Sequence, residues 1–369
     1  MRTRAAIGGV ALALSAGWSL ANVGAVAGRI ADAYGVSLAV VGLFTTALVL
    51  THAAMQIPAG RFCDRFGARV VGAVGVAVIL CASLAGLALR EAWFAILVRL
   101  VTGLGLAGAF VGGADYVRAT LRSPLAQGFY GAASMASAGL ALALVPLWPG
   151  WQAPFATAAI VAAVSLVLVA IAAPAGGRRG ESERTARIFD RRLVPLGVMH
   201  AASFGLSVVI GNWVGTLLAR VGGESAQVAG VVGGLVLFLG VVSRPLGGRL
   251  VDRPAVVRAS FVFGAFGIAL LAVARPPALA VLAAAIVGLA AGIPFASALS
   301  GAQRLRPDAP GAAVGFVNLA ATLVILVGTP LLGLTFSLPG GGRVGFVIAA
   351  VLCLAATASA RKASRGSLV

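Results

Sequence analysis

The stretch GRFCDRFGAR at residues 60–69 returns in altered form as GGRLVDRPAVVR at residues 247–258. When the two stretches are aligned, Asp64 falls on Asp252, 188 residues further on, which is about half of the chain. Each copy follows one long apolar stretch and precedes another. The repeat therefore predicts two similar membrane halves joined head to tail.

The composition excludes an ordinary soluble domain. Hydrophobic residues make up 60% of the chain and charged residues 10%, and the mean hydropathy is +1.04. Soluble domains carry about 25% charged residues. A helix needs roughly 20 apolar residues to cross the membrane, whereas a barrel strand alternates over about ten. The apolar stretches of this chain are long and do not alternate, so they predict membrane-spanning helices.

Twelve such stretches occur, six in each half, which predicts an all-α integral membrane protein made of two pseudo-symmetric six-helix bundles. We expect one bundle over 1–173, a cytoplasmic linker over 174–192 and the second bundle over 193–369. The predicted spans are 6–27, 38–59, 70–89, 93–114, 126–146, 153–173, 193–218, 226–246, 259–274, 278–300, 311–336 and 343–360.

Basic residues are distributed unequally over the loops. Of the 28 arginines and lysines, 22 lie on one set of alternate loops, 5 lie on the other set and Arg99 lies within a span. Because basic loops remain in the cytoplasm, both termini and both copies of the repeat are predicted to be cytoplasmic, in a bacterial inner membrane. This asymmetry and contact with anionic lipid explain the net charge of +18, so we expect no nucleic-acid partner.

The N-terminus allows two interpretations. MRTR, followed by an apolar run and AVA at 25–27, is similar to a cleavable signal peptide, in which case the mature chain would start near Gly28. We favour a retained first helix, because the repeated stretch lies after the second span of its half. Cys63, Cys81 and Cys353 lie in a cytoplasmic loop or within spans and imply no disulfide.

Together, the two six-helix halves, the loop at 60–69, its weaker copy and the basic central loop resemble the major facilitator superfamily. The resemblance covers nearly the whole chain. It implies a monomeric secondary transporter that works by alternating access, without catalytic residues, a cofactor or a metal, and that binds its solute between the halves near the midplane. In that family the loop stabilises one conformation of the cycle. The residues expected to form this latch are Gly60, Asp64, Arg65, Arg69, Asp115, Asp252 and Arg253.

The chemistry of the latch follows from its residue types. Asp64 can accept hydrogen bonds from the N-terminus of a facing helix or from an arginine, and Gly60 allows a close approach of two backbones. Asp115 lies at the cytoplasmic end of the fourth span, with Arg118 one turn further on. The alternative interpretation is that these charged residues only determine topology.

Ionisable and amide side chains inside the spans are the candidates for contact with the solute. Arg99 either couples protons or attracts an anion, or it is a structural arginine bonded to carbonyls of the first helix. His52 and Gln56 share one helix face, and His52 either carries a coupling proton or bonds to a neighbouring helix. Asn22 and Asn212, at similar depths in the first and seventh spans, either line a site or join helices. Lesser candidates are His200, Trp213, Asn318 and Tyr130.

SRPLGGRLVDR at 243–253 looks like the eighth helix of nitrate/nitrite porters, where an arginine pairs with a second-helix arginine to clamp the anion. The offset of the repeat sets Gln56 at the position of the second arginine, opposite Arg244, so half of the clamp is missing. A guanidinium can form two hydrogen bonds with an oxyanion or a carboxylate. The resemblance therefore implies a relative of nitrate and cyanate type permeases, unless Arg244 is only a cytoplasmic-end topology residue.

The sequence predicts transport of a small solute, and a small anion or organic acid is favoured. Its binding residues would be Gln56 and Arg244 with Arg99. One alternative is export of apolar or cationic compounds, although no Asp or Glu falls mid-span and the glycine-proline signature of many exporters is absent from GFYGAASMASAG at 128–139. Another is a membrane sensor or scaffold without transport. An enzyme is disfavoured, and the expected partners are the solute, the lipid bilayer and a coupling proton or ion.

Overall fold

The computed structural model describes residues 2–175, 190–223, 226–273 and 277–366, which form helices and no strands. Eleven helical segments within these residues are long and apolar enough to cross a membrane. The all-α membrane fold expected from the sequence is therefore confirmed. Most of the expected linker, 174–192, lies outside the described residues.

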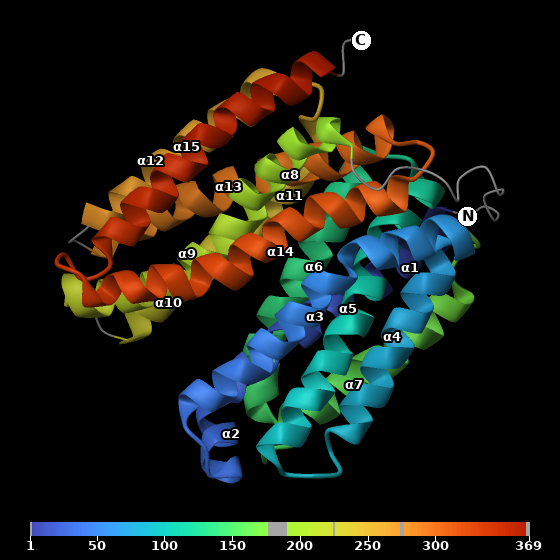
Figure 1. The fold of residues 1–369 in the computed structure, drawn as a ribbon, viewed down its shortest axis with the longest axis horizontal. Coiled ribbons are helices and arrows are strands. Elements are labelled where there is room, and N and C mark those ends of the chain that lie inside the picture. Colours follow the sequence, from blue (N-terminus) through green and yellow to red (C-terminus); the bar gives the residue numbers. More distant parts are fainter. Residues whose placement is uncertain (1, 176–189, 224–225, 274–276, 367–369) are drawn as a thin grey trace. The chain divides into compact units, whose positions relative to one another are not determined.

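The chain divides into two compact units, and the first is built around α5 (Ala92–Leu121). This helix packs against α1, α3 and α4, and small residues in these helices permit the close packing (Figure 1). The unit comprises Met1–Ala126, Ala133–Ile188 and Arg306–Gly315. Its other helices are α1 (Arg2–Ala21), η1 (Gly24–Val26), α2 (Ala27–Tyr34), α3 (Leu38–Phe66), α4 (Ala68–Ala85), η2 (Val145–Leu147), α7 (Ala153–Ile171), most of α6 (Pro124–Leu144) and the first turn of α14 (Pro310–Leu334).

The second unit has α13 (Pro277–Leu305) among the helices of its core, in contact with α10, α11 and α12 (Figure 1). It comprises Gln127–Ala132, Phe189–Leu305 and Phe316–Val369. Its other helices are η4 (Arg191–Leu193), α8 (Val194–His200), η5 (Ala201–Gly205), α9 (Leu206–Leu217), η6 (Leu218–Gly222), α10 (Ala226–Phe238), α11 (Gly240–Arg249), α12 (Pro254–Val273), η7 (Thr335–Ser337) and α15 (Arg343–Gly366). Six residues of α6 and most of α14 also belong to it.

The eighth expected span, 226–246, is divided into α10 and α11. Leu239 lies between the two helices, and its carbonyl accepts hydrogen bonds from the backbone N–H groups of Val242 and Ser243. Pro245 lies inside α11 and cannot donate a hydrogen bond to the preceding turn. Two short helices therefore occupy the place of one long helix, which is why eleven and not twelve long spans are found in the described residues.

The first span also ends earlier than expected. α1 ends at Ala21, where the sequence predicted residue 27. The side chain of Asn22 explains this end, because Asn22 Oδ1 accepts from the N–H of Val23 (2.9 Å) and Nδ2 donates to the carbonyl of Pro154 in α7 (2.8 Å). An asparagine that bonds to nearby backbone groups competes with the helix.

Candidate functional site

Arg244 of α11 is surrounded by polar and aromatic residues of the second unit. Its side chain is buried, with 4% of the residue exposed. The guanidinium carbon lies 4.3 Å from the ring centroid of Phe295 in α13 and 5.0 Å from that of Phe204 in η5. Nη1 donates a hydrogen bond to the carbonyl of Gly131 in α6 (2.7 Å). Two phenyl rings and one carbonyl therefore hold the cation by cation–π and hydrogen-bond contacts.

Within the described ranges of the chain, the guanidinium of Arg244 is not paired with a carboxylate. A guanidinium has five N–H donors, and the bond to Gly131 is the one hydrogen bond that Arg244 forms among the described residues. None of the ion pairs in this part of the chain includes Arg244. A buried cation that keeps most of its donors free can bind an anion, because burial strengthens the attraction and the donors fit an oxyanion.

His200 and Asn318 lie next to this cation in the same unit. Nε2 of His200 is 3.1 Å from Oδ1 of Asn318, and the imidazole is 5.4 Å from Phe295 and 5.6 Å from Phe204, measured between ring centroids. Both polar residues are buried. The structure therefore gathers His200, Asn318 and Arg244 around two phenylalanines.

In the first unit, His52 and Gln56 bond to each other. Nε2 of His52 lies 2.7 Å from Nε2 of Gln56, on successive turns of α3 as expected. Both residues are buried, and among the described residues Nδ1 of His52 and Oε1 of Gln56 have no hydrogen-bond partner. The pair thus presents one unused nitrogen and one unused oxygen, which suits a neutral or weakly polar group of a ligand.

Arg99 and Asn22 form one buried connection in the first unit. Nη2 of Arg99 donates to the carbonyl of Ser19 (3.0 Å), Nη1 to Oδ1 of Asn22 (3.2 Å) and Nε to the carbonyl of Phe44 (3.4 Å). Arg99 is 2% exposed. These contacts to the end of α1 and to α3 correspond to the structural alternative for Arg99, and they use all three nitrogens of the guanidinium.

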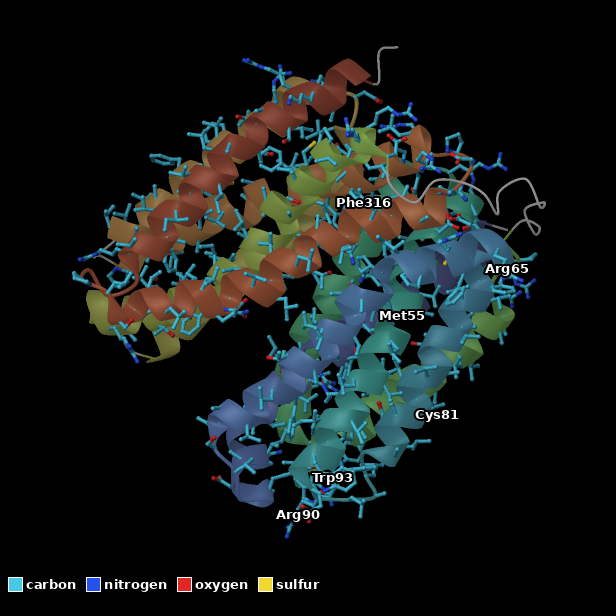
Figure 2. The ribbon with its side chains drawn as sticks, in the orientation of Figure 1. Met55, Arg65, Cys81, Arg90, Trp93 and Phe316 are labelled. Carbon is cyan, nitrogen blue, oxygen red and sulfur yellow. The ribbon has the colours of Figure 1, made fainter. Side chains whose placement is uncertain are left out.

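Substitution of Arg99 by glutamine is expected to reduce stability more than it reduces solute affinity. Loss of the guanidinium leaves buried acceptors of α1 and α3 without donors, which costs about 2 to 3 kcal/mol. Thermal unfolding of the purified protein in detergent measures the change, with Arg90→Gln as the control, because Arg90 is exposed before α5 (Figure 2). Wild-type stability combined with a large loss of solute binding would assign Arg99 to the solute site instead.

Asn212 is exposed on α9 and forms no hydrogen bond among the described residues. The π-helical segment η5 lies between Leu193 and Asn212. A π-helical turn holds more residues than an α-helical turn, so side chains beyond it are rotated from the faces that regular spacing predicts. Counting residues along such a helix predicts how deep a residue lies in the membrane, but it does not predict on which face of the helix its side chain lies.

Asp64 binds the N-terminus of α14. Its Oδ1 accepts from the N–H of Gly311 (2.8 Å) and its Oδ2 from the N–H of Ala312 (2.9 Å). Asp64 is buried, with 8% exposed. The negative charge and the positive end of the helix dipole stabilise each other. A helix N-terminus is one of the two kinds of partner expected for Asp64 from the sequence.

The loop before α14 is held by its own ion pair. Nη2 of Arg306 lies 2.6 Å from Oδ2 of Asp308. The hydrogen bonds from Arg306 lower the pKa of the Asp308 carboxyl below its ordinary value. Asp308 therefore remains ionised at neutral pH, and the loop that leads to the turn bound by Asp64 keeps its shape.

The other latch candidates differ in their contacts. Arg69 donates to the carbonyls of Val169 and Ala170 at the end of α7. Asp115 pairs with Arg118 (2.6 Å). Arg65 is exposed, lies 4.9 Å from the centroid of the Phe66 ring and points outward from the end of α3 (Figure 2).

The second copy of the repeat lacks the contacts of the first. Asp252 and Arg253 are exposed, and the structure assigns neither a hydrogen bond nor an ion pair to their side chains within the described ranges. Asp64 and Asp252 thus occupy equivalent positions of the repeat in different environments.

Glycines allow helices to cross at equivalent positions in both units. A Cβ atom on Gly315 of α14 would lie 2.2 Å from the carbonyl oxygen of Gln56, and one on Gly128 of α6 would lie 2.3 Å from that of Arg244. A third close contact joins Gly60 of α3 to α14, where a Cβ would lie 2.3 Å from the carbonyl oxygen of Gly311. A side chain at any of the three glycines would separate the helices.

Substitution of Gly60 by alanine is expected to lower transport about three- to tenfold, because the added methyl group forces apart the two backbones beside Asp64 and overpacking costs about 1 to 3 kcal/mol. Gly42→Ala is the matched control, since Gly42 lies on the same helix and a Cβ there meets no atom within 4 Å. Uptake by both variants is measured in proteoliposomes at equal protein content. Equal rates for the two variants would show that the close approach at Gly60 is unimportant for transport.

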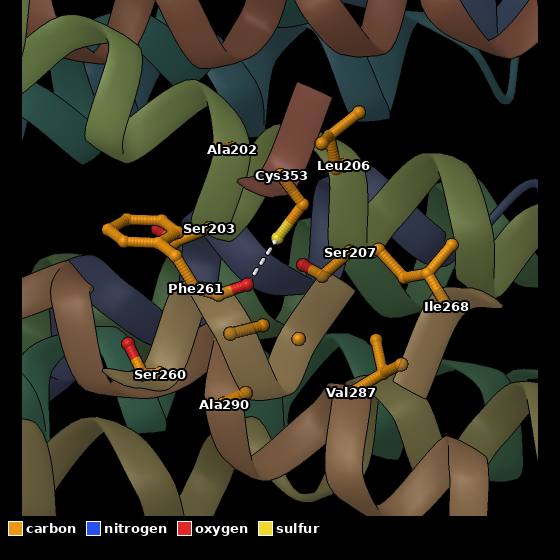
Figure 3. Close-up of a pocket in the computed structure, with 12 residues that line it drawn as sticks. Ala202, Ser203, Leu206, Ser207, Ser260, Phe261, Ile268, Val287, Ala290 and Cys353 are labelled. Atoms are coloured by element: carbon orange, nitrogen blue, oxygen red, sulfur yellow. Dashed lines mark hydrogen bonds between the residues drawn. The ribbon is translucent and has the colours of Figure 1, made fainter. Parts of the chain in front are cut away.

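A small cavity lies in the second unit and is lined in part by residues of η5 and α9 (Figure 3). Its volume of about 10 Å³ holds about one water molecule. Serines 203, 207 and 260 and Cys353 contribute to its lining, and the Cys353 thiol donates to the carbonyl of Phe261 (3.5 Å). This cavity is too small for a solute.

Sequence reasoning missed Phe204 and Phe295 as functional candidates and ranked His200 low. Phe204 follows His200 by four residues, which places both on one face of a helix. Phe295 gives no comparable signal, because it is one of 17 phenylalanines in an apolar chain. Gln127 and Gln303, which bond to each other in the second unit (3.2 Å), were also missed, although buried glutamines inside spans are a recognisable signal.

The chain is similar to a known family and to curated proteins. The profile of the Major Facilitator Superfamily matches residues 7–329. A protein of Mycobacterium tuberculosis (strain ATCC 25618 / H37Rv), described as "Probable nitrate/nitrite transporter NarK2", is 30% identical over 329 residues, which cover 83% of this chain and 82% of that protein.

Solved structures of transporters have a similar fold. The human organic anion transporter MFSD10 (TETRAN) superposes with a TM-score of 0.75 at 16% identity, covering 96% of this chain and 98% of that one. The proton:xylose symporter XylE gives a TM-score of 0.80 at 13% identity, covering 96% and 94%. At these identities the similarity concerns the fold alone.

Proposed function

The chain belongs to the Major Facilitator Superfamily, so it is a multi-pass secondary active transporter of a small solute and not an enzyme, and we propose that this solute is a small anion. The observation that carries the proposal is the buried guanidinium of Arg244, which has one hydrogen bond and no carboxylate partner among the described residues. An unpaired charge in the membrane is costly. A bound anion offsets this cost and uses the free donors.

The surroundings of Arg244 favour an anion over a cation. Phe204 and Phe295 exclude water from the guanidinium and strengthen its field. A cationic solute would meet repulsion from the same charge, so export of cationic compounds is disfavoured. The relative that is described as a probable nitrate/nitrite transporter supports a small oxyanion as the solute. Arg244 can form two parallel hydrogen bonds with such an ion.

Asp64 supplies the conformational part of this function. α14 passes from the first unit to the second after Gly315. If α14 tilts with the second unit during the cycle, its first turn has to leave Asp64, which breaks two hydrogen bonds to a carboxylate. Asp64 would then stabilise one conformation and set part of the barrier to leaving it. In this scheme the chain works as a monomer in a bacterial inner membrane. Both termini and the latch lie on the cytoplasmic side of that membrane.

Flux measurements in proteoliposomes test the proposed function. Vesicles containing the protein and preloaded with nitrate should take up labelled nitrite by counterflow, and formate should compete, whereas a neutral sugar should not. Extrusion of a cationic dye that is unaffected by anions would instead support an exporter. Absence of flux for every solute, with a correctly inserted protein, would support a sensor or scaffold.

A further inference from the structure

His200 is a buried titratable group that anion binding by Arg244 alone does not require. It ends α8, directly before the π-helical segment η5, and it is 0% exposed. The amide oxygen of Asn318 faces Nε2 (3.1 Å), so the neutral imidazole carries its hydrogen on Nε2. Nδ1 then presents a lone pair and has no hydrogen-bond partner among the described residues. His200 therefore has one nitrogen fixed and one nitrogen ready to take a proton.

The imidazole of His200 and the guanidinium of Arg244 contact the same two rings. Phe295 and Phe204 lie 5.4 and 5.6 Å from the imidazole, measured between centroids, and 4.3 and 5.0 Å from the guanidinium carbon. Because both groups share these neighbours, an anion held by the free donors of Arg244 also lies within the electrostatic reach of His200.

The charged residues on the elements around His200 are all basic, and the acid nearest to it in the sequence, Asp190 directly before η4, is paired with Arg192. α8 packs against η4, η5, α13 and α15, and the hydrogen bonds of His200 and Arg244 add α6, α11 and α14. In the described residues these elements contain no Asp or Glu. The ionisable residues of these elements whose side chains the structure describes are Tyr130, Arg191, Arg192, Arg244, Arg249, Arg304, Arg343, Cys353, Arg361 and Lys362.

Among these residues, Arg244 is the cation that contacts the same two phenyl rings as the imidazole. Two cations this close repel each other strongly in a medium of low polarity. The protein offers no carboxylate on the surrounding elements to compensate a second positive charge. A bound anion can compensate it, because the anion neutralises Arg244 and can accept a hydrogen bond from protonated Nδ1.

We propose that His200 takes up one proton when an anion binds at Arg244, so that the anion and the proton cross the membrane together. This inference rests on the proposed anion transport. The proton comes from water on the side to which the site is open, adds to Nδ1 and returns to water with the anion on the other side. Nε2 keeps its hydrogen bond to Asn318 throughout.

Anion binding and protonation then strengthen each other by the same factor. Lower pH favours the protonated imidazole and therefore tightens anion binding, and higher pH weakens it. Over the range in which the empty site is neutral and the occupied site is protonated, the affinity changes about tenfold per pH unit, as for uptake of one proton. For a monovalent anion the transported pair carries no net charge.

Proton uptake by the purified protein tests the proposal directly. Sodium nitrate is added to the protein in weakly buffered detergent solution with a pH indicator, and nitrate binding is measured in parallel by calorimetry. The wild type should bind nitrate and take up close to one proton per bound ion. His200→Gln should still bind nitrate, take up no proton and show an affinity independent of pH. Met199→Leu, next to His200 and without a titratable group, should behave as the wild type.

The outcomes separate the two proposals. Absence of nitrate and nitrite binding by the wild type would overturn the anion proposal and the coupling together. Binding that Arg244→Gln removes, without proton uptake in the wild type, would overturn the coupling alone. Uptake that persists in His200→Gln, or that His52→Gln removes instead, would overturn the assignment to His200. The pH dependence of nitrate affinity in the wild type needs no variant, and a flat dependence also contradicts the coupling.

Discussion

Arg244→Gln is expected to reduce anion transport by about 30-fold or more. Loss of one partner of a buried, hydrogen-bonded charge pair costs about 2 to 5 kcal/mol, and each 1.4 kcal/mol corresponds to about tenfold in affinity. Glutamine fits between Phe204 and Phe295 but carries no charge. Nitrate or nitrite counterflow in proteoliposomes measures the effect, together with nitrate affinity in detergent.

Two further variants distinguish a role in binding from a role in topology. Arg244→Lys keeps the charge but loses the forked geometry, so it should retain a small part of the transport. Arg249 is exposed and is the last residue of α11, five positions after Arg244. Arg249→Gln should therefore leave counterflow close to wild type. If Arg249→Gln and Arg244→Gln impaired membrane insertion equally and binding not at all, Arg244 would be a topology residue.

Asp64→Asn is expected to lower transport at least tenfold while insertion and folding remain intact. An asparagine can accept from only one of the N–H groups of Gly311 and Ala312, and its own NH₂ group faces the other. Hydrogen bonds to charged groups contribute about 1.5 to 3 kcal/mol each, and the helix dipole adds about 0.3 to 1 kcal/mol. The conformation held by Asp64 therefore becomes less populated, and the cycle slows.

The repeat supplies the control for this prediction. Asp252→Asn makes the same change at the equivalent position, where the side chain is exposed and has no partner in the described part of the chain. Initial uptake rates are compared at equal amounts of inserted protein, with folding checked by size-exclusion chromatography. Wild-type uptake by Asp64→Asn, or equal losses in both variants, would contradict a latch formed by the first copy.

The sequence predicted those features that depend on the types of nearby residues. The apolar stretches predicted the spans, and the repeat located Asp64. A carboxylate in an apolar chain needs a strong donor, so the helix N-terminus that it binds could be expected from Asp64 itself. The observed partners, Gly311 and Ala312, lie almost 250 residues away in sequence, and no local pattern identifies them.

The proposed solute site was harder to predict, because its residues depend on helix rotation. The repeat pointed to Arg244, but Phe204, Phe295 and His200 meet it only through tertiary packing. The π-helical segment η5 also changes the faces beyond it, which is why counting from Leu193 did not predict the exposed position of Asn212. Regular periodicity is a reliable guide until an extra residue enters a turn.

The close contact between α6 and α11 can serve as a pivot point for α11. The carbonyl of Arg244 lies against Gly128, so Arg244 is at the point where the two helices touch. If α11 swings by about 10° around this point, Arg249 at the end of the helix, five positions and about 7.5 Å away, moves by about 1 Å. Arg244, at the pivot point itself, hardly moves. The side chain proposed to bind the anion can therefore stay in place while the two ends of α11 move.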